Sequence, residues 1–280
     1  MLLALLCAVG AMVLFGIAAV LQALATRRAV DVQVLDPRLL LRLAHQPVFL
    51  AALALNGLGF LLHVIALQRL PLFLVQAVIA GAVAVTAVLS VRVLGVRLGR
   101  GQWGAVALVV LGLVLLAPTA TESSGITPGV REPGALLAAV VLVCLVAASV
   151  RQVPGATGTV LLGLLAGTGF GVVAVCARLL PSYGPQLLTS PVAYVLVLAG
   201  GAAYLVYSAA MQRGSVTTAT AAMVITQTVV PAAAGLFLGD GVRAGLVPVA
   251  VLGFALALAG ALGLGRFEQL EAVPVGSATR

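Results

Sequence analysis

Two polar residues on one helical face, Asn56 and His63, are the first candidates for chemistry in this sequence of 280 residues. Asn56, Gly59 and His63 are spaced at 0, +3 and +7, which places them on one side of a helix. An imidazole that titrates near neutral pH can couple proton movement to another process. A histidine in an apolar run can also simply pack, hydrogen-bonded to a neighbouring helix. The sequence leaves both interpretations open.

Five further polar residues lie in other apolar runs. Thr220, Gln227 and Pro231 share a helical face, and Pro231 frees a backbone carbonyl because it has no N–H to donate. Such side chains can line a cavity for a solute, or they can only tie helices together at about 0.6 kcal/mol each. The predicted substrate-binding set is Asn56, His63, Gln76, Tyr204, Tyr207, Thr220 and Gln227.

Motifs for enzymatic chemistry are not found. The sequence has no G-x-S-x-G, HExxH or P-loop motif, and its three cysteines have no CxxC spacing. We therefore expect no enzyme, no catalytic residue, no metal site and no cofactor, and any transport would be secondary or facilitated. The seven acids lie outside the apolar runs, with Asp240 at the end of one. This weakens both a proton relay through a membrane carboxylate and direct Mg²⁺ binding.

The composition indicates the environment of the chain. Hydrophobic residues make up 62% of it and charged residues 8%, whereas a soluble domain has roughly 25% charged residues. The fifteen basic residues are all arginine and lie mostly at the ends of apolar runs, without a basic stripe among exposed aromatics. We therefore expect an all-α, polytopic membrane helix bundle and no nucleic-acid partner.

Nine apolar runs approach or reach the length that a helix needs to cross a bilayer. The first ends before Arg27 and Arg28, which favours a retained helix over a cleaved signal peptide. The runs are 2–25, 47–68, 71–94, 102–118, 134–150, 158–180, 188–211, 215–238 and 244–265.

The arginines sort unequally between the two sides of these runs. Eleven fall on one side, and four, Arg69, Arg131, Arg178 and Arg243, on the other. The positive-inside rule then predicts a multi-pass protein of the cell inner (plasma) membrane, with its N-terminus outside and its C-terminus cytoplasmic.

The sequence also repeats itself. Gln68-Arg69 matches Gln212-Arg213 at an offset of 144, and the same offset carries Gly95 onto Gly239. The repeats comprise helices 1–4 and 6–9, so equivalent helices lie five apart and cross in opposite directions, as inverted repeats do. The expected division is 1–118 for the first repeat, 119–133 for an extracytoplasmic linker, 134–150 for a connecting helix, 151–265 for the second repeat and 266–280 for a cytoplasmic tail.

Residues 70–116 (LPLFLVQAVIAGAVAVTAVLSVRVLGVRLGRGQWGAVALVVLGLVLL) resemble the closing helix pair of an EamA-type repeat in the drug/metabolite transporter (DMT) superfamily. Leu94-Gly95-Val96-Arg97 and Leu238-Gly239-Asp240-Gly241 take the place of that family's LGE-R-like turn, with the Glu absent from the first and replaced by Asp in the second. The opening GIAAVLQALATRR is similar to the nine-helix NIPA magnesium-transporter-like branch.

The resemblance implies a secondary transporter of a small solute, drug or metabolite, working by alternating access. It also implies a cavity lined by helices 2, 3, 7 and 8. Two alternatives stay open, a divalent-cation (Mg²⁺) transporter of NIPA type and a non-transporting membrane scaffold or partner subunit. The expected partners are a small-molecule or ion substrate and the lipid bilayer, with a homodimer left open.

Overall fold

The computed structural model describes residues 1–28, 46–93, 95, 97–121, 132–150, 152–180, 186–211 and 216–270. These residues are almost entirely helical, and their only β-type pairing is an isolated antiparallel bridge between Ala120 and Val242. The helices are α1 (Leu2–Arg28), α3 (Pro47–Leu67), α4 (Leu72–Ala80), α5 (Ala82–Val93), α6 (Arg100–Leu116), the 3-10 turn η1 (Ala117–Thr119), α7 (Glu132–Val150), α8 (Gly155–Leu179), α9 (Gln186–Thr189), α10 (Pro191–Met211), α11 (Val216–Phe237) and α12 (Val247–Leu270).

Nine segments among the described residues are long and apolar enough to cross a membrane, and each coincides with one of the nine predicted runs. The predicted all-α polytopic bundle is therefore confirmed, and the chain is a multi-pass membrane protein. The helix α12 continues to Leu270, although the apolar segment within it ends at Leu264, next to the predicted boundary at 265. Most of the predicted linker 119–133 and of the tail lies outside the described residues.

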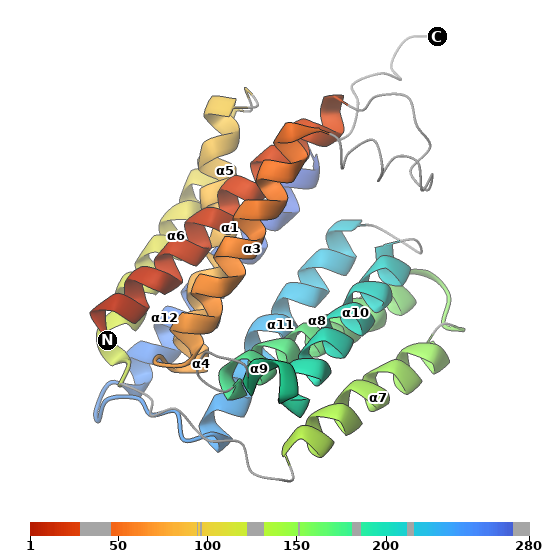
Figure 1. The fold of residues 1–280 in the computed structure, drawn as a ribbon. Helices are drawn as coiled ribbons and strands as arrows, with labels where there is room; N and C mark the ends of the chain where they lie inside the picture. The colour runs from red at the N-terminus through yellow and green to blue at the C-terminus, as the bar shows by residue number, and fades with distance from the viewer. Residues whose placement is uncertain are drawn as a thin grey trace.

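The helices gather into two halves (Figure 1). The first half contains α1, α3, α5 and α6 together with α12, and the second contains α7, α8, α10 and α11. The helix α12, from the end of the chain, packs along α6, while α4, from the first part of the chain, packs against α11. Each half thus takes in one element from the other part of the sequence.

The first helices of the two predicted repeats run in opposite directions. Ala4 and Ala8, from the start of α1, share a buried cluster with Ala174 and Ala177, from the end of α8. The repeat-related glycines Gly95 and Gly239 also adopt the same left-handed backbone, with φ of 70° and 79°. Both observations are as expected for inverted repeats, in which equivalent segments have the same local structure and the opposite orientation.

Glycines bring the helices of the second half close together. Three glycines of α8 face α11. A Cβ atom on Gly163 would lie 2.7 Å from Ala219 O, and one on Gly167 would lie 2.1 Å from Met223 O. A Cβ atom on Gly171 would lie 3.1 Å from Pro231 Cδ. Without side chains at these positions the two backbones can approach, which is how membrane helices gain packing energy when surrounding lipid is as apolar as they are. Glycines of α6 and α12 meet in the same way, since a Cβ on Gly112 would lie 2.5 Å from Gly253 O. These two pairs are therefore closely packed.

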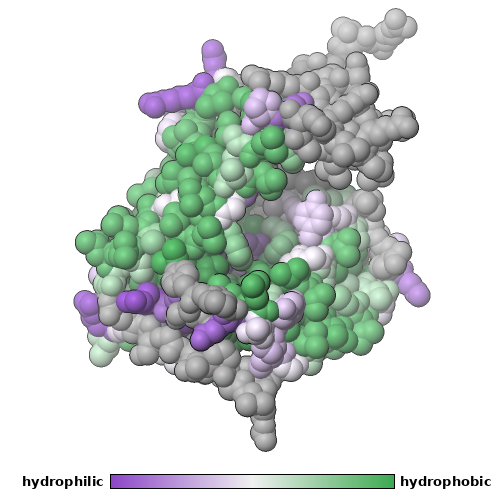
Figure 2. Space-filling view, viewed as in Figure 1, coloured by the Kyte–Doolittle hydropathy of each residue, from purple (hydrophilic) through white to green (hydrophobic). Residues whose placement is uncertain are grey.

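The two halves meet at one end of the molecule and diverge toward the other. Figure 2 shows the surface hollowed between them. Among the described residues, α3 packs along α1 but has no extensive interface with α10 or α11. We call the end with the α3–α4 turn the closed end, and the end with the last turns of α5 and α12 the open end (Figure 1).

The third span contains a one-residue turn near its middle, where the backbone stays close to helical. Helix α4 ends at Ala80, and α5 starts at Ala82 after a turn at Gly81. A Cβ on Gly81 would lie 2.9 Å from Met12 Sδ and 2.9 Å from Val78 O, so the site has room only for glycine. The segment before this turn packs on α11 and the segment after it packs on α1.

The glycine contacts lead to a first prediction. Gly167→Ala should destabilise the protein by about 1–3 kcal/mol, because the added methyl group overpacks the α8–α11 crossing. Gly201→Ala, in α10, is the matched control, since nothing lies within 4 Å of its Cβ position. Thermal melting in detergent compares the two. Equal melting temperatures for both variants would show that this crossing is not tightly packed.

Candidate functional site

The α3–α4 turn leaves backbone groups that need partners inside an apolar medium. Helix α3 ends at Leu67, and α4 begins at Leu72 directly after Pro71, its N-cap residue. Proline has no side-chain oxygen to cap a helix, and no side-chain cap from Pro71 is present. Carbonyls at the end of one helix and amides at the start of the next therefore need donors and acceptors from elsewhere.

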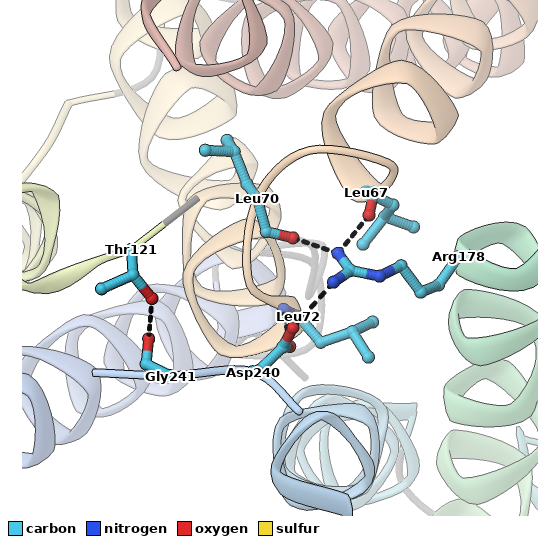
Figure 3. Close-up of polar contacts among 7 residues, drawn as sticks. All are labelled: Leu67, Leu70, Leu72, Thr121, Arg178, Asp240 and Gly241. Atoms are coloured by element: carbon cyan, nitrogen blue, oxygen red, sulfur yellow. Dashed lines mark hydrogen bonds and ion pairs between the residues drawn. The ribbon is translucent and has the colours of Figure 1, made fainter. Parts of the chain in front are cut away.

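Arg178, in the last turn of α8, satisfies the carbonyls. Its Nη1 donates hydrogen bonds to the carbonyl oxygens of Leu67 and Leu70, and its Nη2 lies 2.8 Å from Asp240 Oδ1 (Figure 3). Only 2% of Arg178 is exposed, and the two paired side chains have no accessible surface. A guanidinium at the end of α3 is favourable because helix C-termini carry partial negative charge.

Asp240, just after α11, satisfies the amide side of the turn. Its Oδ2 accepts a hydrogen bond of 2.5 Å from the Leu72 N–H, so it serves as the N-terminal cap that Pro71 cannot provide. Gly235 makes this geometry accessible, since a Cβ there would lie 2.4 Å from Asp240 Oδ2. The turn at Gly239, with φ of 79°, folds the chain back so that the Asp240 N–H bonds Gly235 O at 2.8 Å.

A second tie lies beside this cluster. Thr121 Oγ1 donates to Gly241 O at 2.8 Å, and the Arg243 N–H donates to Thr119 O at 2.8 Å. The segment after α6 is thereby joined to the loop between α11 and α12. The closed end is held by polar bonds that join distant parts of the chain, here called the polar lock, defined as Arg178, Asp240 and their backbone partners Leu67, Leu70 and Leu72.

The predicted residues of α3 lie against α1. The ring of His63 makes an edge-on contact with Phe15 at a centroid distance of 6.4 Å, and His63 is 9% exposed. A Cβ on Gly59 would touch the same Phe15 ring at 3.0 Å, and Asn56 Nδ2 bonds Ala52 O within its own helix at 3.1 Å. The surroundings of His63 are those of a packing residue in a helix seam, so we leave it out of the function proposed below.

Two of the predicted residues in the second half come together. The hydroxyls of Tyr207 on α10 and Thr220 on α11 lie 2.6 Å apart, within one hydrogen bond. Tyr204, one turn earlier on α10, is 63% exposed and is not part of this contact. Of the two predicted tyrosines, only Tyr207 forms a hydrogen bond between α10 and α11 within the part of the chain that the structure describes.

Gln76 is the polar residue whose environment needs an explanation. It is 3% exposed in α4, and its Nε2 has no hydrogen-bond partner among the described residues. Helices α4 and α11 run antiparallel with Gly235 against Leu72, so Gln76, about 6 Å further along α4, reaches roughly the level of Pro231. Gln227 lies one turn from Pro231, half-buried on α11. An unsatisfied buried amide costs stability and is a frequent mark of function.

The polar lock was not predicted from the sequence as a unit. The positive-inside rule applies to arginines in loops, whereas Arg178 is buried and paired with Asp240. Arg178 therefore gives no information on the orientation of the chain in the membrane. Removing it leaves eleven arginines against three (four less one), and the predicted orientation is unchanged. A usable signal existed, because an ionisable residue inside a predicted span calls for a partner, and Asp240 is an acid at a helix end on the same predicted side.

Comparisons with known proteins do not extend this description. A scan against protein-family models, a search of curated proteins and a search of solved structures each find no match to this chain. The assignment to the DMT superfamily, EamA-like or NIPA-type, remains a prediction based on the motifs quoted above.

The two buried glutamines allow a matched comparison. Gln76→Leu should leave the protein as stable or make it more stable, because it removes an amide nitrogen without a partner. Gln102→Leu should cost about 0.5–2 kcal/mol, since Gln102 Oε1 accepts a 2.6 Å bond from the Gly99 N–H at the start of α6. Melting curves of both variants test this. Strong destabilisation by Gln76→Leu would mean that the amide has a structural partner.

Proposed function

We propose that the protein is a secondary transporter that moves a small solute by alternating access. The observation that carries this proposal is the hollow between the two halves, which are tied by buried polar bonds at one end and diverge at the other. A site that can be reached from one side, with the other side sealed, is the arrangement that an alternating-access carrier needs. The opposite direction of the first helices of the two repeats supports the same scheme.

The arginines give the proposed direction of opening. Arg92, Arg97 and Arg100 are exposed at the open end, around the turn between α5 and α6. Because positive residues are retained on the cytoplasmic side, the hollow would face the cytoplasm and the polar lock would lie at the extracytoplasmic face. The conformation described is then the inward-facing one.

The available polar groups limit the kind of solute. Gln76, Gln227 and the Tyr207–Thr220 couple are neutral, and no acid lies in the middle of a predicted span. Neutral amides and hydroxyls suit a solute that is recognised by hydrogen bonds and apolar contact. They suit Mg²⁺ poorly, because that cation prefers carboxylates and water. We therefore favour an organic solute over the cation.

The scaffold alternative makes a different structural demand. A protein that only holds partners together gains nothing from a hollow between its halves, and we would expect its polar faces to be sealed against each other. The surface in Figure 2 and the unpartnered amide of Gln76 support the transporter instead.

Membrane orientation is tested with tags at the two ends. A tag at Met1 should be accessible from outside the cell and a tag at Arg280 only after permeabilisation, because an odd number of spans separates them. Protease protection of each tag in intact cells and in inverted vesicles is the measurement. Both tags in the same compartment would contradict the nine-span topology.

Transport itself is tested in two steps. Purified protein is first screened by thermal shift against amino acids, nucleosides, cationic drugs and MgCl₂, since a ligand of the folded state raises the melting temperature. An organic hit should then show counterflow in proteoliposomes, and Gln76→Leu should lower this counterflow at unchanged melting temperature. A shift and counterflow with Mg²⁺ alone would select the cation carrier. No counterflow with any hit, in protein that melts cooperatively, would contradict transport.

A further inference from the structure

The polar lock joins parts of the chain that belong to different halves. Leu67, Leu70 and Leu72 flank the turn that leads from α3 of the first half into α4. Arg178 belongs to α8 of the second half, and Asp240 follows α11 of that half. Two of its bonds therefore cross between the halves, from Arg178 to Leu67 and Leu70, while the bond from Leu72 to Asp240 joins α4 to the half on which it packs. Any separation of the halves at this end must break them.

We propose that the polar lock is the gate that seals the closed end, and that the transport cycle opens it by separating Arg178 and Asp240 from the α3–α4 turn. This inference rests on the proposed function, and it identifies the residues that hold one of the two alternating states. The lock fits the task because its bonds can be exchanged for water. In the closed state the ion pair offsets part of the cost of desolvating two charges, and on opening water hydrates both, so the strongly directional contact can be released.

Among the residues that the structure describes, the lock is seen in the second repeat. Asp240 follows Gly239, and the repeat-related residue after Gly95 is Val96, which has no carboxylate. Gly95 and Gly239 share the left-handed backbone, but a carboxylate follows only Gly239. A carrier with such an asymmetry rests with the Arg178 end closed, which is the state described here.

The third span, formed by α4 and α5, has a turn at Gly81 where it can bend. The lock holds the first residue of α4, Leu72, through its N–H. The turn at Gly81 separates α4, which packs on α11, from α5, which packs on α1. Opening of the lock at Leu67 and Leu70 would let α4 move with the second half while α5 stays with the first, and the span would bend at Gly81.

Thiol labelling tests the gate without a substrate. Ala174 lies one turn before Arg178 on the same face of α8 and is 6% exposed, so Ala174→Cys reports water entry behind the lock. The background carries Cys144→Ala, which removes the exposed native thiol, while Cys7 and Cys176 are buried. A membrane-impermeant maleimide is added from the Arg178 side of proteoliposomes. The same protein without Ala174→Cys gives the background rate.

Asp240→Asn and Arg178→Gln should each raise the labelling rate of Cys at position 174 about tenfold or more, because loss of either partner leaves a buried charge that favours the hydrated, open state. Gly235→Ala should do the same with both charges present, since its methyl group displaces the carboxylate. Arg243→Gln is the matched control, because it removes an exposed charge from the same loop and should leave labelling slow.

Cys176 distinguishes opening from unfolding. It lies in a different buried cluster, with Val172, Val192 and Val195, and should stay unreactive when only the gate opens. Faster labelling at position 174 with Cys176 still protected supports the gate. Unchanged labelling at 174, or equal exposure of both thiols, overturns it. A gate that opens in a protein without counterflow would contradict the transport proposal alone, and counterflow with unchanged labelling would contradict the gate alone.

Discussion

A membrane interior has no water to satisfy free backbone groups, and the turn between α3 and α4 must meet this requirement with side chains from elsewhere in the chain. Pro71 starts α4 without a cap, and the carbonyls of Leu67 and Leu70 lie inside the protein. One buried ion pair, Arg178 with Asp240, meets all these needs at once. The contact between the halves at the closed end, the route of the α11–α12 loop and the place of Gly235 all follow from it.

The remainder of the fold combines two closely packed helix pairs with a sparse contact between the two halves. Glycines let α8 approach α11 and let α6 approach α12, so each pair is closely packed. Between the halves, α3 faces a hollow instead of packing along α10 or α11. The third span contacts both halves, because α4 packs on α11 and α5 packs on α1. Closely packed helix pairs that are joined at one end by the polar lock suit a carrier that alternates between two states.

The sequence predicted the elements well and their partners poorly. Long apolar runs determine nine spans, and the offset of 144 correctly paired Gly95 with Gly239, which share a left-handed turn. Helical spacing put Gly59 and His63 on one face, but it could not show that Phe15 of α1 covers that face. The bond between Arg178 and Asp240 joins residues 62 positions apart, and only the packing of α8, α11 and the α3–α4 turn brings them together. The sequence indicated that Arg178 needs a partner, but local patterns could not show that the carbonyls of Leu67 and Leu70 would also bond to it.

The most direct test of the account is whether the two ends move in opposite senses. Spin labels at Val114 and Leu188, both exposed near the closed end, and at Arg92 and Leu205, exposed toward the open end, would each report a distance between the halves by pulsed electron resonance in liposomes. Comparison of the native sequence with Asp240→Asn should show the closed-end distance increasing and the open-end distance decreasing. Distances that stay the same at both ends, or that increase at both, would contradict a carrier whose resting state is held by this ion pair.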